Sequence, residues 1–490
     1  MSEETVIQKK EIRPLRVSIK TIGCQMNMYD TEVAEGLLQN QGMQILSSFD
    51  ETAGTLPGIA YSPFPEADVI LMNTCSIREH AEERVFGRLG LLKEAKRVQP
   101  ELIIGLMGCM VEEHREKLFQ KYPHLDLMVG TRNISELPAL IEEVRKERKQ
   151  VARIKQEGIS IEYTDQIKRA GSYHAWLPVM TGCNKVCTFC IVPITRGSEV
   201  SMPAREVYRE ASRLVDDGVR WITLLGQNVN SYDGRKAEDG RRKEGQNPSA
   251  AGLHPSAAFP ELLDTLCQIE GLERISFTTS HPSDATEELY RVIAKNPKIS
   301  RRFHLPLQSG ANPVLKRMKR LHTYEEFKQK IDSMRRWIPE ISVTTDIIAG
   351  FCGETEQDHQ DTLRALGELC FDDAYIYKYS TRPGTPASKL ADDVPISIKE
   401  QRNRELLELQ KTIRQRNNEQ LLGETFEVFV EEISPKDPSQ LRGRTQAEKT
   451  VVFPGPQSLL GSFQKVKFRA LRHETFLGIL EAEPAEKAHL

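Results

Sequence analysis

Three short, β-rich runs in the N-terminal part of the chain each end in a cysteine. The runs are RVSIKTIGC, ADVILMNTC and ELIIGLMGC, and the cysteines are Cys24, Cys75 and Cys109. Stretches with a helical pattern follow these runs, and such alternation indicates a mainly parallel sheet with right-handed crossovers. Ligands of these sheets collect at the carboxyl ends of the strands. We therefore expect a doubly wound parallel sheet on which the three cysteines meet in space.

A second series of strand and helix patterns begins at Trp176. The candidate strands are WLPVM, RWITLLGQ, RISFTTS, RFHLPLQS, ISVTTDIIAGF and DAYIYKYS. Six such units are fewer than the eight of a closed barrel, so we predict a partial (β/α)6 barrel. The C-terminal pattern changes to alternating strands, in TFEVFVEEI, RGRTQAEKTVVFP and FQKVKFRALRHETFLGIL. These predict a small all-β barrel with Gly443 and Gly461 near its turns.

The 490 residues are thus expected to form an α/β protein of three domains. The stretch 47–68 is rich in Pro, Gly and Ser and is expected to be a surface loop. The predicted parts are a flexible tail 1–14, an N-terminal domain 15–145, a linker 146–171, a partial barrel 172–396 with an insertion at 233–260, a connecting helix 397–420 and a C-terminal barrel 421–483.

The composition argues for a cytoplasmic protein with reduced thiols. The chain has no apolar run of the length that spans a membrane. Its first fifteen residues are charged and lack the apolar core of a secretory signal. Nine cysteines, an odd number, do not suggest a disulfide framework. The net charge of −3 requires any nucleic-acid surface to be a local patch.

The segment TGCNKVCTFCIVPITRG carries the strongest chemical signal of the chain. Cys183, Cys187 and Cys190 are spaced C-x3-C-x2-C. Three thiolates can hold three corners of a [4Fe–4S] cluster and leave one iron open to a small molecule. The alternatives are a zinc site without its fourth ligand or reduced structural cysteines, and no His lies within eight residues to complete a zinc tetrahedron.

The other cysteines allow two interpretations. Cys24, Cys75 and Cys109 could be buried packing residues, because free cysteine is often simply a small buried hydrophobe. Three cysteines on corresponding strand ends favour a second cluster instead. Cys267, Cys352 and Cys370 lack ligand spacing and are interpreted as packing residues.

The C-x3-C-x2-C segment, with Phe189 before its last cysteine, resembles the signature of the radical S-adenosylmethionine (SAM) superfamily. The resemblance implies that the open iron is chelated by the amino and carboxylate groups of SAM. It also implies that one electron from the reduced cluster cleaves the sulfonium and gives a 5′-deoxyadenosyl radical. In such enzymes the cofactor supplies the chemistry, while the protein positions it and excludes water.

From about residue 15 to 483 the chain resembles the methylthiotransferases of that superfamily. The matching segments are TIGCQMN, NTCSIRE, GCMVEE, LGQNVNSY, SFTTSHP, HLPLQSG, TTDIIAGFCGETEQD and YSTRPGTPA, and the C-terminal barrel is similar to an OB-like TRAM domain. The resemblance implies a second [4Fe–4S] cluster on Cys24, Cys75 and Cys109 that carries the transferred sulfur. SAM then has two uses, as methyl donor and as radical source.

The segments GCNKVCTFCIVPITRG, LGQNVNSY and GRTQAEKTVVFPG favour one branch of that family. Its members place a methylthio group on C2 of N6-dimethylallyladenosine next to the anticodon of tRNA. The alternatives are another tRNA adenosine derivative or a ribosomal-protein aspartate as substrate. A non-catalytic iron–sulfur protein that binds RNA or transfers electrons is a further rival, and the open-iron spacing argues against it.

Strand ends supply the candidate SAM contacts. Gly226, Gln227 and Asn228 end the second barrel strand, Gln308 and Ser309 the fourth, and Gly350, Gly353 and Glu354 the fifth. Arg196 follows the cysteine loop and could neutralise a carboxylate or phosphate. The plain alternatives are ordinary turn residues and, for Arg196, a surface ion pair.

A basic stretch in the C-terminal barrel suggests RNA binding. Residues 441–472 contain seven lysines and arginines and one acid, Glu448. RNA affinity comes mainly from phosphate contacts, so such a face suits tRNA; the alternative is a solvated face over core phenylalanines. The predicted RNA-binding residues are Arg442, Arg444, Lys449, Lys465 and Lys467. The expected partners are tRNA bearing N6-dimethylallyladenosine, an electron donor and a cluster or sulfur carrier protein, with no membrane and a monomeric chain.

Overall fold

The computed structural model describes residues 13–46, 66–76, 79–155, 167, 173–234 and 258–481, with side chains omitted at 79–81. Two compact units divide the chain: residues 1–168 with 194–196, and residues 169–193 with 197–490. Most of the predicted tail 1–14, loop 47–68 and insertion 233–260 lies outside the described residues. The predicted domain limits stay predictions. Within the described ranges, none of the helices has the length and apolar character that a membrane span requires.

The first unit is built on a six-stranded sheet in the order β2–β1–β3–β4–β5–β6, and every pairing is parallel. Its strands are β1 (Arg16–Ile22), β2 (Gln44–Ile45), β3 (Val69–Thr74), β4 (Ile103–Gly108), β5 (Leu127–Val129) and β6 (Val151–Arg153). Residues of β3 and β4 are buried throughout, which explains their continuous apolar runs. The predicted parallel sheet is confirmed, and the segment predicted as a linker contributes β6 to it.

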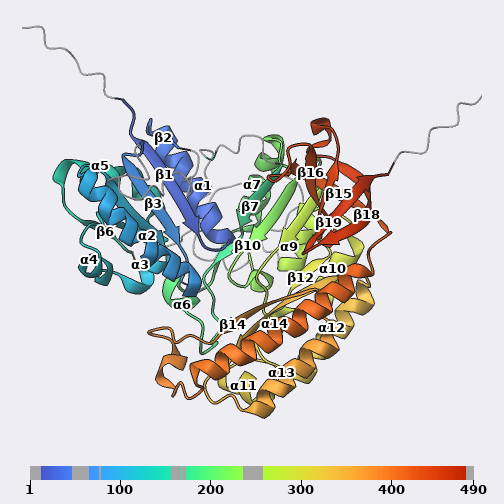
Figure 1. Ribbon diagram of the computed structural model, residues 1–490. Helices are drawn as coiled ribbons and strands as arrows, with labels where there is room; N and C mark the ends of the chain where they lie inside the picture. The colour runs from blue at the N-terminus through green and yellow to red at the C-terminus, as the bar shows by residue number, and fades with distance from the viewer. Residues whose placement is uncertain are drawn as a thin grey trace, which may run out of the picture. The chain divides into compact units, whose positions relative to one another are not determined.

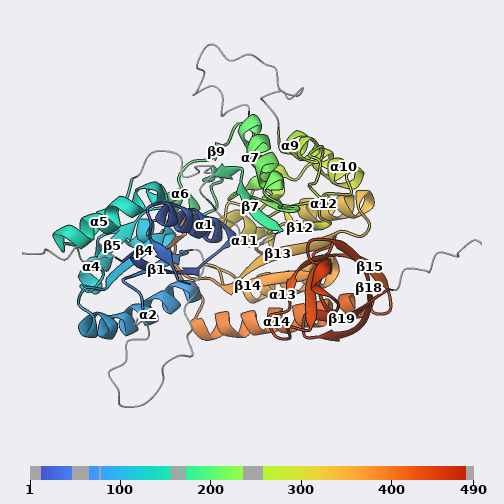
Figure 2. The same cartoon turned by 90° about the horizontal axis from the view of Figure 1, so that it is seen from above.

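Helices cover both faces of this sheet, as a doubly wound fold requires. Figure 2 shows α1 and α5 on one side of the strands and α2 on the other. The helical elements of this unit are α1 (Gln25–Asn40), α2 (Glu79–Val98), α3 (Cys109–His114), α4 (Lys117–Lys121), η1 (Ile134–Glu136) and α5 (Leu137–Glu147). Packing of these helices on the sheet buries side chains such as Leu89, Leu106 and Met110 in one hydrophobic core.

Six parallel strands form the partial barrel of the second unit, as predicted. They are β7 (His174–Pro178), β10 (Trp221–Leu225), β11 (Arg274–Phe277), β12 (Arg302–His304), β13 (Ser342–Ala349) and β14 (Asp373–Lys378). They make two three-stranded parallel sheets, β7–β10–β11 and β12–β13–β14, linked by a bridge between Ile275 and Ile299. Among the described residues β14 does not close onto β7, so the barrel is open.

The helices of the second unit lie outside these strands, and α7, α9, α10, α12, α13 and α14 neighbour one another in that order (Figure 1). They are α7 (Ala204–Asp216), α9 (Phe259–Leu266), α10 (Glu287–Lys295), α11 (Asn312–Arg317), α12 (Tyr324–Trp337), α13 (Glu356–Leu369) and α14 (Ile396–Glu419). Val207, Ala211 and Leu214 form the buried face of α7 at helical spacing. Helix α14 confirms the predicted helix at 397–420. Shorter elements of the second unit are β8 (Met180–Thr181), β9 (Val200–Ser201), η2 (Val229–Ser231), η3 (Pro282–Asp284) and η4 (Pro386–Lys389), and the residues of α6 (Val192–Thr195) are divided between the two units.

The chain ends in a closed five-stranded barrel in the order β15–β16–β17–β19–β18. Its elements are β15 (Thr425–Ile433), β16 (Gln440–Thr445), β17 (Thr450–Pro454), η5 (Gln457–Leu459), β18 (Phe463–Arg472) and β19 (Thr475–Leu480). The predicted all-β barrel is confirmed, with Phe453, Phe468 and Phe476 in its core.

Two local expectations for this barrel are wrong. The last two predicted strands are hairpins, because the chain turns near Glu448 and His473, which adopt positive φ without being glycine. Gly443 lies inside β16 rather than at a turn. A Cβ atom there would lie 2.3 Å from the Phe429 carbonyl oxygen, so glycine permits the close approach of β15.

Candidate active site

The three N-terminal cysteines lie together at one edge of the six-stranded sheet. Cys24, Cys75 and Cys109 follow β1, β3 and β4, which are adjacent parallel strands, so their carboxyl ends meet. A hydrogen bond from the Cys75 thiol and the positive charge of Arg196 lower the pKa of Cys24 to about 6. Cys24 therefore favours the thiolate, which is the form of cysteine that binds metal.

Arg196 brings the positive charge to this site. Its side chain is 3% exposed. Its Nη2 donates to Oδ2 of Asp30 at 2.7 Å, and its Nε donates to Sγ of Cys109 at 3.3 Å. Burial raises the pKa of the Cys109 thiol, and the charge of Arg196 opposes that effect. The carboxylate that Arg196 neutralises in the structure is thus that of Asp30, in a buried ion pair.

Two asparagines that the sequence patterns did not single out support the cysteines. Asn27 on α1 accepts a hydrogen bond from the Cys24 backbone amide through Oδ1 at 3.2 Å and donates to Asn73 Oδ1 at 3.0 Å. Asn73 in turn donates to the Asn27 carbonyl at 2.8 Å. Gly108, before Cys109, has φ +96°, and a Cβ atom there would lie 2.5 Å from Asn73 Oδ1. The only sequence signal for these asparagines was their place in the segments TIGCQMN and NTCSIRE.

The cysteines of the second unit lie in one loop after β8. The Cys190 amide donates to the Cys187 carbonyl at 3.2 Å, and the Lys185 amide donates to Cys183 Sγ at 3.4 Å. Burial raises the pKa of Cys190 to about 12 and also raises that of Cys183. Phe189 packs against Phe351, with ring centroids 6.5 Å apart, and so anchors the loop to the barrel core.

Two side chains from other parts of the barrel reach Cys187. Arg320 Nη1 lies 3.3 Å from its sulfur and His281 Nε2 lies 3.9 Å from it. Burial, assisted by the charges of Arg320 and Lys185, lowers the pKa of His281 to about 2, so this ring is neutral. Neither residue was among the sequence candidates, although His281 stands in the SFTTSHP segment.

Polar atoms without partners gather after the barrel strands. Oδ1 of Asn228, Oγ of Ser280 and Oε1 of Gln308 are buried and have no hydrogen-bond partner among the described residues. They follow β10, β11 and β12, whose carboxyl ends form the mouth of the barrel. Gln308 also has φ +72°, a strained value of the kind that functional sites retain. Buried polar groups are almost always paired, so these atoms mark a place for a polar ligand.

Most of the other predicted SAM contacts have hydrogen-bond partners within the chain. Gln227 accepts the Gly182 amide through Oε1 at 2.6 Å and so holds the start of the cysteine loop. Glu354 accepts the Gly350 amide at 3.0 Å and pairs with Arg402 of α14 at 2.9 Å. Gly226 follows β10 directly, Ser309 lies 3.3 Å from Thr362 through their hydroxyl oxygens, and the Gly353 amide donates to Asp393 at 2.6 Å.

Three of the predicted RNA-binding residues form ion pairs within the second unit. Arg442 pairs with Glu432, Arg444 with Glu431 at 2.6 Å, and Lys449 with Asp372 at 2.7 Å. Arg444 also stacks over the Trp221 ring at 4.1 Å. The contacts of Lys449 with Asp372 and of Arg444 with Trp221 join the C-terminal barrel to the partial barrel, whereas the other two ion pairs lie within the C-terminal barrel.

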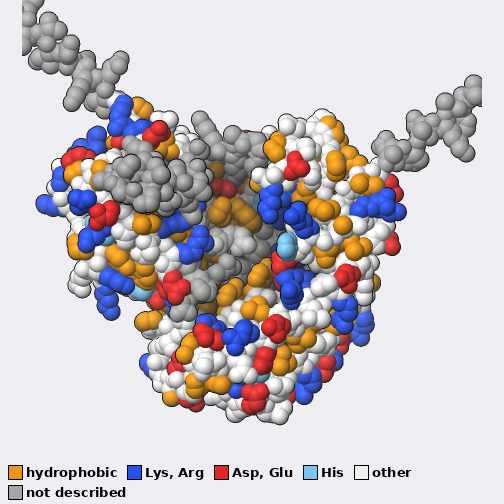
Figure 3. Space-filling view, viewed as in Figure 1, with side chains coloured by type: hydrophobic (Ala, Val, Ile, Leu, Met, Phe, Trp, Pro, Cys, Tyr) orange, Lys and Arg blue, Asp and Glu red, His pale blue; other side chains and the backbone are white. Residues whose placement is uncertain are grey.

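Lys465 and Lys467, on β18, have no ion pair among the described residues, and Arg469 on the same strand is exposed. Leu477 and Ile479 of the adjacent β19 are also exposed, at 37% and 41%. Figure 3 shows hydrophobic and basic side chains next to one another over this part of the surface. Strand β18 therefore presents free basic groups beside apolar side chains.

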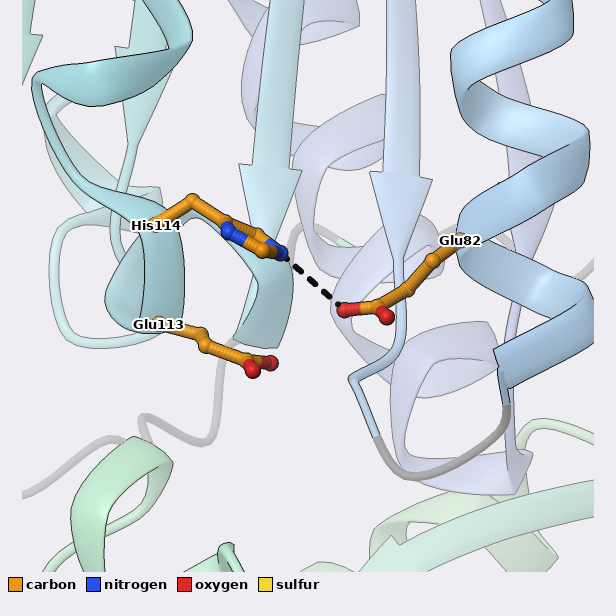
Figure 4. Close-up of side chains that lie close together, drawn as sticks. All are labelled: Glu82, Glu113 and His114. Atoms are coloured by element: carbon orange, nitrogen blue, oxygen red, sulfur yellow. Dashed lines mark hydrogen bonds and ion pairs between the residues drawn. The ribbon is translucent and has the colours of Figure 1, made fainter. Parts of the chain in front are cut away.

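Figure 4 shows a further group of possible metal ligands in the first unit, formed by Glu82 on α2 with Glu113 and His114 on α3. One ligand atom of each lies within 4.8 Å of the others. His114 Nε2 and Glu82 Oε1 are 3.2 Å apart and hydrogen bonded, which accounts for their proximity.

Comparison with protein families gives three matches along the chain. Residues 58–130 match an uncharacterized protein family, UPF0004; residues 177–366 match the radical SAM superfamily; and residues 419–472 match the TRAM domain. Among solved structures, the radical S-adenosylmethionine methyltransferase TsrM from Kitasatospora setae has a TM-score of 0.52 at 14% identity, covering 76% of this chain and 77% of that chain. This structure shows likeness of fold alone.

Two curated relatives are similar over almost their whole length. The tRNA-2-methylthio-N(6)-dimethylallyladenosine synthase of Protochlamydia amoebophila is 40% identical over 94% of this chain and 96% of that protein. The synthase of the same name from Moorella thermoacetica is 41% identical over the same shares. The chain belongs to the tRNA-2-methylthio-N(6)-dimethylallyladenosine synthase family. This confirms the predicted branch of the methylthiotransferases, rather than the branches that act on other tRNA adenosines or on a ribosomal-protein aspartate.

Membership in this radical SAM family implies SAM and a [4Fe–4S] cluster as cofactors. The residues of the second unit fit both groups. The cysteine loop offers three thiols within eight residues, which suits a cluster with one open iron. The unpaired oxygens of Asn228, Ser280 and Gln308 suit the amine and hydroxyl donors of SAM.

Proposed function

We propose that this protein converts N6-dimethylallyladenosine in tRNA to its 2-methylthio derivative, next to the anticodon, with SAM as methyl donor and radical source. The observation that carries the proposal is the presence of two separate three-cysteine sites, one in each unit. Membership in the synthase family supports the substrate.

The first site, on Cys24, Cys75 and Cys109, is proposed to hold a second [4Fe–4S] cluster that carries the transferred sulfur. The low pKa of Cys24 supports this role because a thiolate is ready to bind iron. Arg196 offsets the negative charge that three thiolates and a cluster bring into a buried place. Asn27 and Asn73 are hydrogen bonded to each other and so fix Cys24, at the start of α1, relative to the end of β3.

In the second site, Cys183, Cys187 and Cys190 are proposed to hold the cluster that binds SAM. When bound, these groups supply the electron and the sulfonium whose cleavage activates the adenine C2–H bond. The chain itself positions SAM through Asn228, Ser280 and Gln308, while Gln227 holds the loop through the Gly182 amide. Phe189 and Phe351 close the barrel core behind the loop.

For tRNA, the exposed face of β18 and β19 is the proposed contact within the C-terminal barrel. Lys465, Lys467 and Arg469 can meet phosphates, and Leu477 and Ile479 can meet sugar or base surfaces. Arg442, Arg444 and Lys449 are proposed to contribute to RNA binding less directly, since acidic groups of the chain already pair with them. We further propose that the protein works as a cytoplasmic monomer that receives electrons from a donor protein and sulfur from a carrier protein.

Reaction of the reconstituted protein with defined tRNA tests this function. The anaerobic assay contains SAM, a low-potential reductant and tRNA that either carries or lacks the dimethylallyl group. Nucleoside mass spectrometry should detect 2-methylthio-N6-dimethylallyladenosine with the first tRNA and no methylthio product with the second. Methylthiolation of the unprenylated tRNA would contradict the proposed substrate. Cleavage of SAM without methylthiolation of either tRNA would contradict it as well.

A further inference from the structure

Cys187 differs from the other two cysteines of its loop in the groups that approach its sulfur. Cys183 Sγ accepts the backbone amide of Lys185 at 3.4 Å. Cys187 Sγ faces two side chains from elsewhere in the barrel, Arg320 Nη1 at 3.3 Å and His281 Nε2 at 3.9 Å. Both side chains are largely buried, with 8% and 5% of their surface exposed.

The hydrogen bonds of His281 determine which ring nitrogen carries the proton. The Ser283 amide donates to Nδ1 of His281 at 3.2 Å. A backbone amide can only donate, so Nδ1 is the unprotonated acceptor and the proton of the neutral ring lies on Nε2. The nitrogen that faces Cys187 is therefore an N–H donor.

The main chain of His281 is fixed as firmly as its ring. Its amide donates to Oδ1 of Asn230 at 2.9 Å, and its carbonyl accepts from Nδ2 of the same residue at 3.0 Å. Pro282 follows and starts η3, which His281 caps through Nδ1. Arg320 is held similarly, since its Nη2 donates to the Pro306 carbonyl at 2.7 Å. Both donors are thus set in position by the fold before any cluster binds.

We infer that His281 and Arg320 donate hydrogen bonds to the Cys187 thiolate and thereby raise the reduction potential of the cluster on this loop. The inference rests on the proposed role of Cys183, Cys187 and Cys190 as cluster ligands. Hydrogen bonds to ligand sulfur stabilise the more negative, reduced cluster, which makes it easier to reduce. His281 and Arg320 are positioning residues in this account, because they act on the cluster through Cys187.

Two substitutions of His281 separate its N–H from its bulk. His281→Phe keeps a planar ring and removes the donor, whereas His281→Gln places an amide N–H near the position of Nε2. Both remove the imidazole nitrogen that caps η3, so a difference between them reports the hydrogen bond. His322→Phe is the matched control, because His322 is a buried neighbour of Arg320 whose ring nitrogens have no hydrogen-bond partner among the described residues.

The measurement is an EPR-monitored redox titration of the reconstituted full-length protein. Cys24, Cys75 and Cys109 are replaced by Ala throughout, so the signal comes from one cluster, and iron content is matched between variants. We expect a clearly more negative midpoint potential for His281→Phe, a smaller shift for His281→Gln and no shift for His322→Phe. Equal potentials for His281→Phe and the parent at equal iron content would overturn the inference.

If His281→Phe binds no cluster, a measurement on the parent protein still tests the inference. Labelling with ¹⁵N-histidine should give a nitrogen coupling to the reduced cluster in pulsed EPR spectra that His322→Phe retains and His281→Gln loses. Absence of that coupling in the parent would also overturn the inference. A parent that binds no cluster on this loop would instead refute the proposed function, so the two failures are distinct.

Discussion

In the first unit, three cysteines reach one place from the ends of three strands, whereas in the second unit three cysteines share one loop, residues 183–190. The first set is accompanied by a buried arginine and an asparagine network, and the pKa of Cys24 falls to about 6. The second set lies in a half-buried loop, in which burial of the Cys190 sulfur raises its pKa to about 12.

The two sites differ in whether their thiols lose protons before the metal binds or only as it binds. Iron binds thiolates, so a site of protonated thiols must release protons as the metal enters. The first site already compensates negative charge with Arg196. In the second site Arg320 and Lys185 compensate the charge only in part, because burial still raises the pKa of Cys183 and of Cys190. This site therefore depends more on the metal itself. The fold thus surrounds two sets of cysteine ligands with different amounts of compensating charge.

The largest expected effect separates the two sites by reaction step. Replacement of Cys183, Cys187 and Cys190 by Ala should abolish SAM cleavage and therefore all product. The same change at Cys24, Cys75 and Cys109 should leave cleavage but stop methylthio transfer. Mass spectrometry of 5′-deoxyadenosine and of tRNA nucleosides measures both steps. Methylthio product from the second variant would remove the sulfur-carrying role of the first site.

Loss of the buried arginine should destabilise the first unit strongly. Arg196→Met leaves Asp30 buried without its partner, and breaking such a pair costs about 3–5 kcal/mol. Urea unfolding of the apoprotein measures the free energy. Arg213→Met is the control, because its more exposed ion pairs should cost about 0–1 kcal/mol. Equal losses in the two variants would show that Arg196 is not the charge centre of the site.

The two sites should also differ in the pH at which their thiols react. Alkylation requires the thiolate, so in the apoprotein the rate at Cys24 should rise through about pH 6, where its pKa lies. Cys190 should stay unreactive until the pH approaches about 12. Peptide mapping after a short iodoacetamide pulse compares the two. Reaction of Cys190 before Cys24 at neutral pH would reverse the comparison of the sites.

The smallest expected effect concerns tRNA binding. Lys465→Ala with Lys467→Ala should reduce the slope of log affinity against log salt by about 1.4–1.8, since each lost phosphate contact contributes about 0.7–0.9. Lys449→Ala is the matched control, because its ammonium group is bound to Asp372. A larger change in slope for the control would place the RNA contact near Lys449 instead.

Periodicity predicted the main strands and the three strand-end cysteines because those features are local in the sequence. The hairpins at Glu448 and His473 escaped prediction, since their turns use positive φ without glycine. The pairing of Arg196 with Asp30 was also missed, because the two residues are distant in sequence. The same reason applies to Arg444 and Lys449, whose acidic partners no local pattern reveals. The sequence thus predicted the candidate cysteine ligands better than it predicted the ion pairs of the charged residues.

Iron and acid-labile sulfide content, measured after anaerobic reconstitution, tests the central claim of two cysteine sites most directly. The parent should bind about eight iron and eight sulfide per chain, as two four-iron clusters require. Each triple-cysteine variant should bind about four of each. About four iron in the parent, with none in one variant and four in the other, would contradict the account.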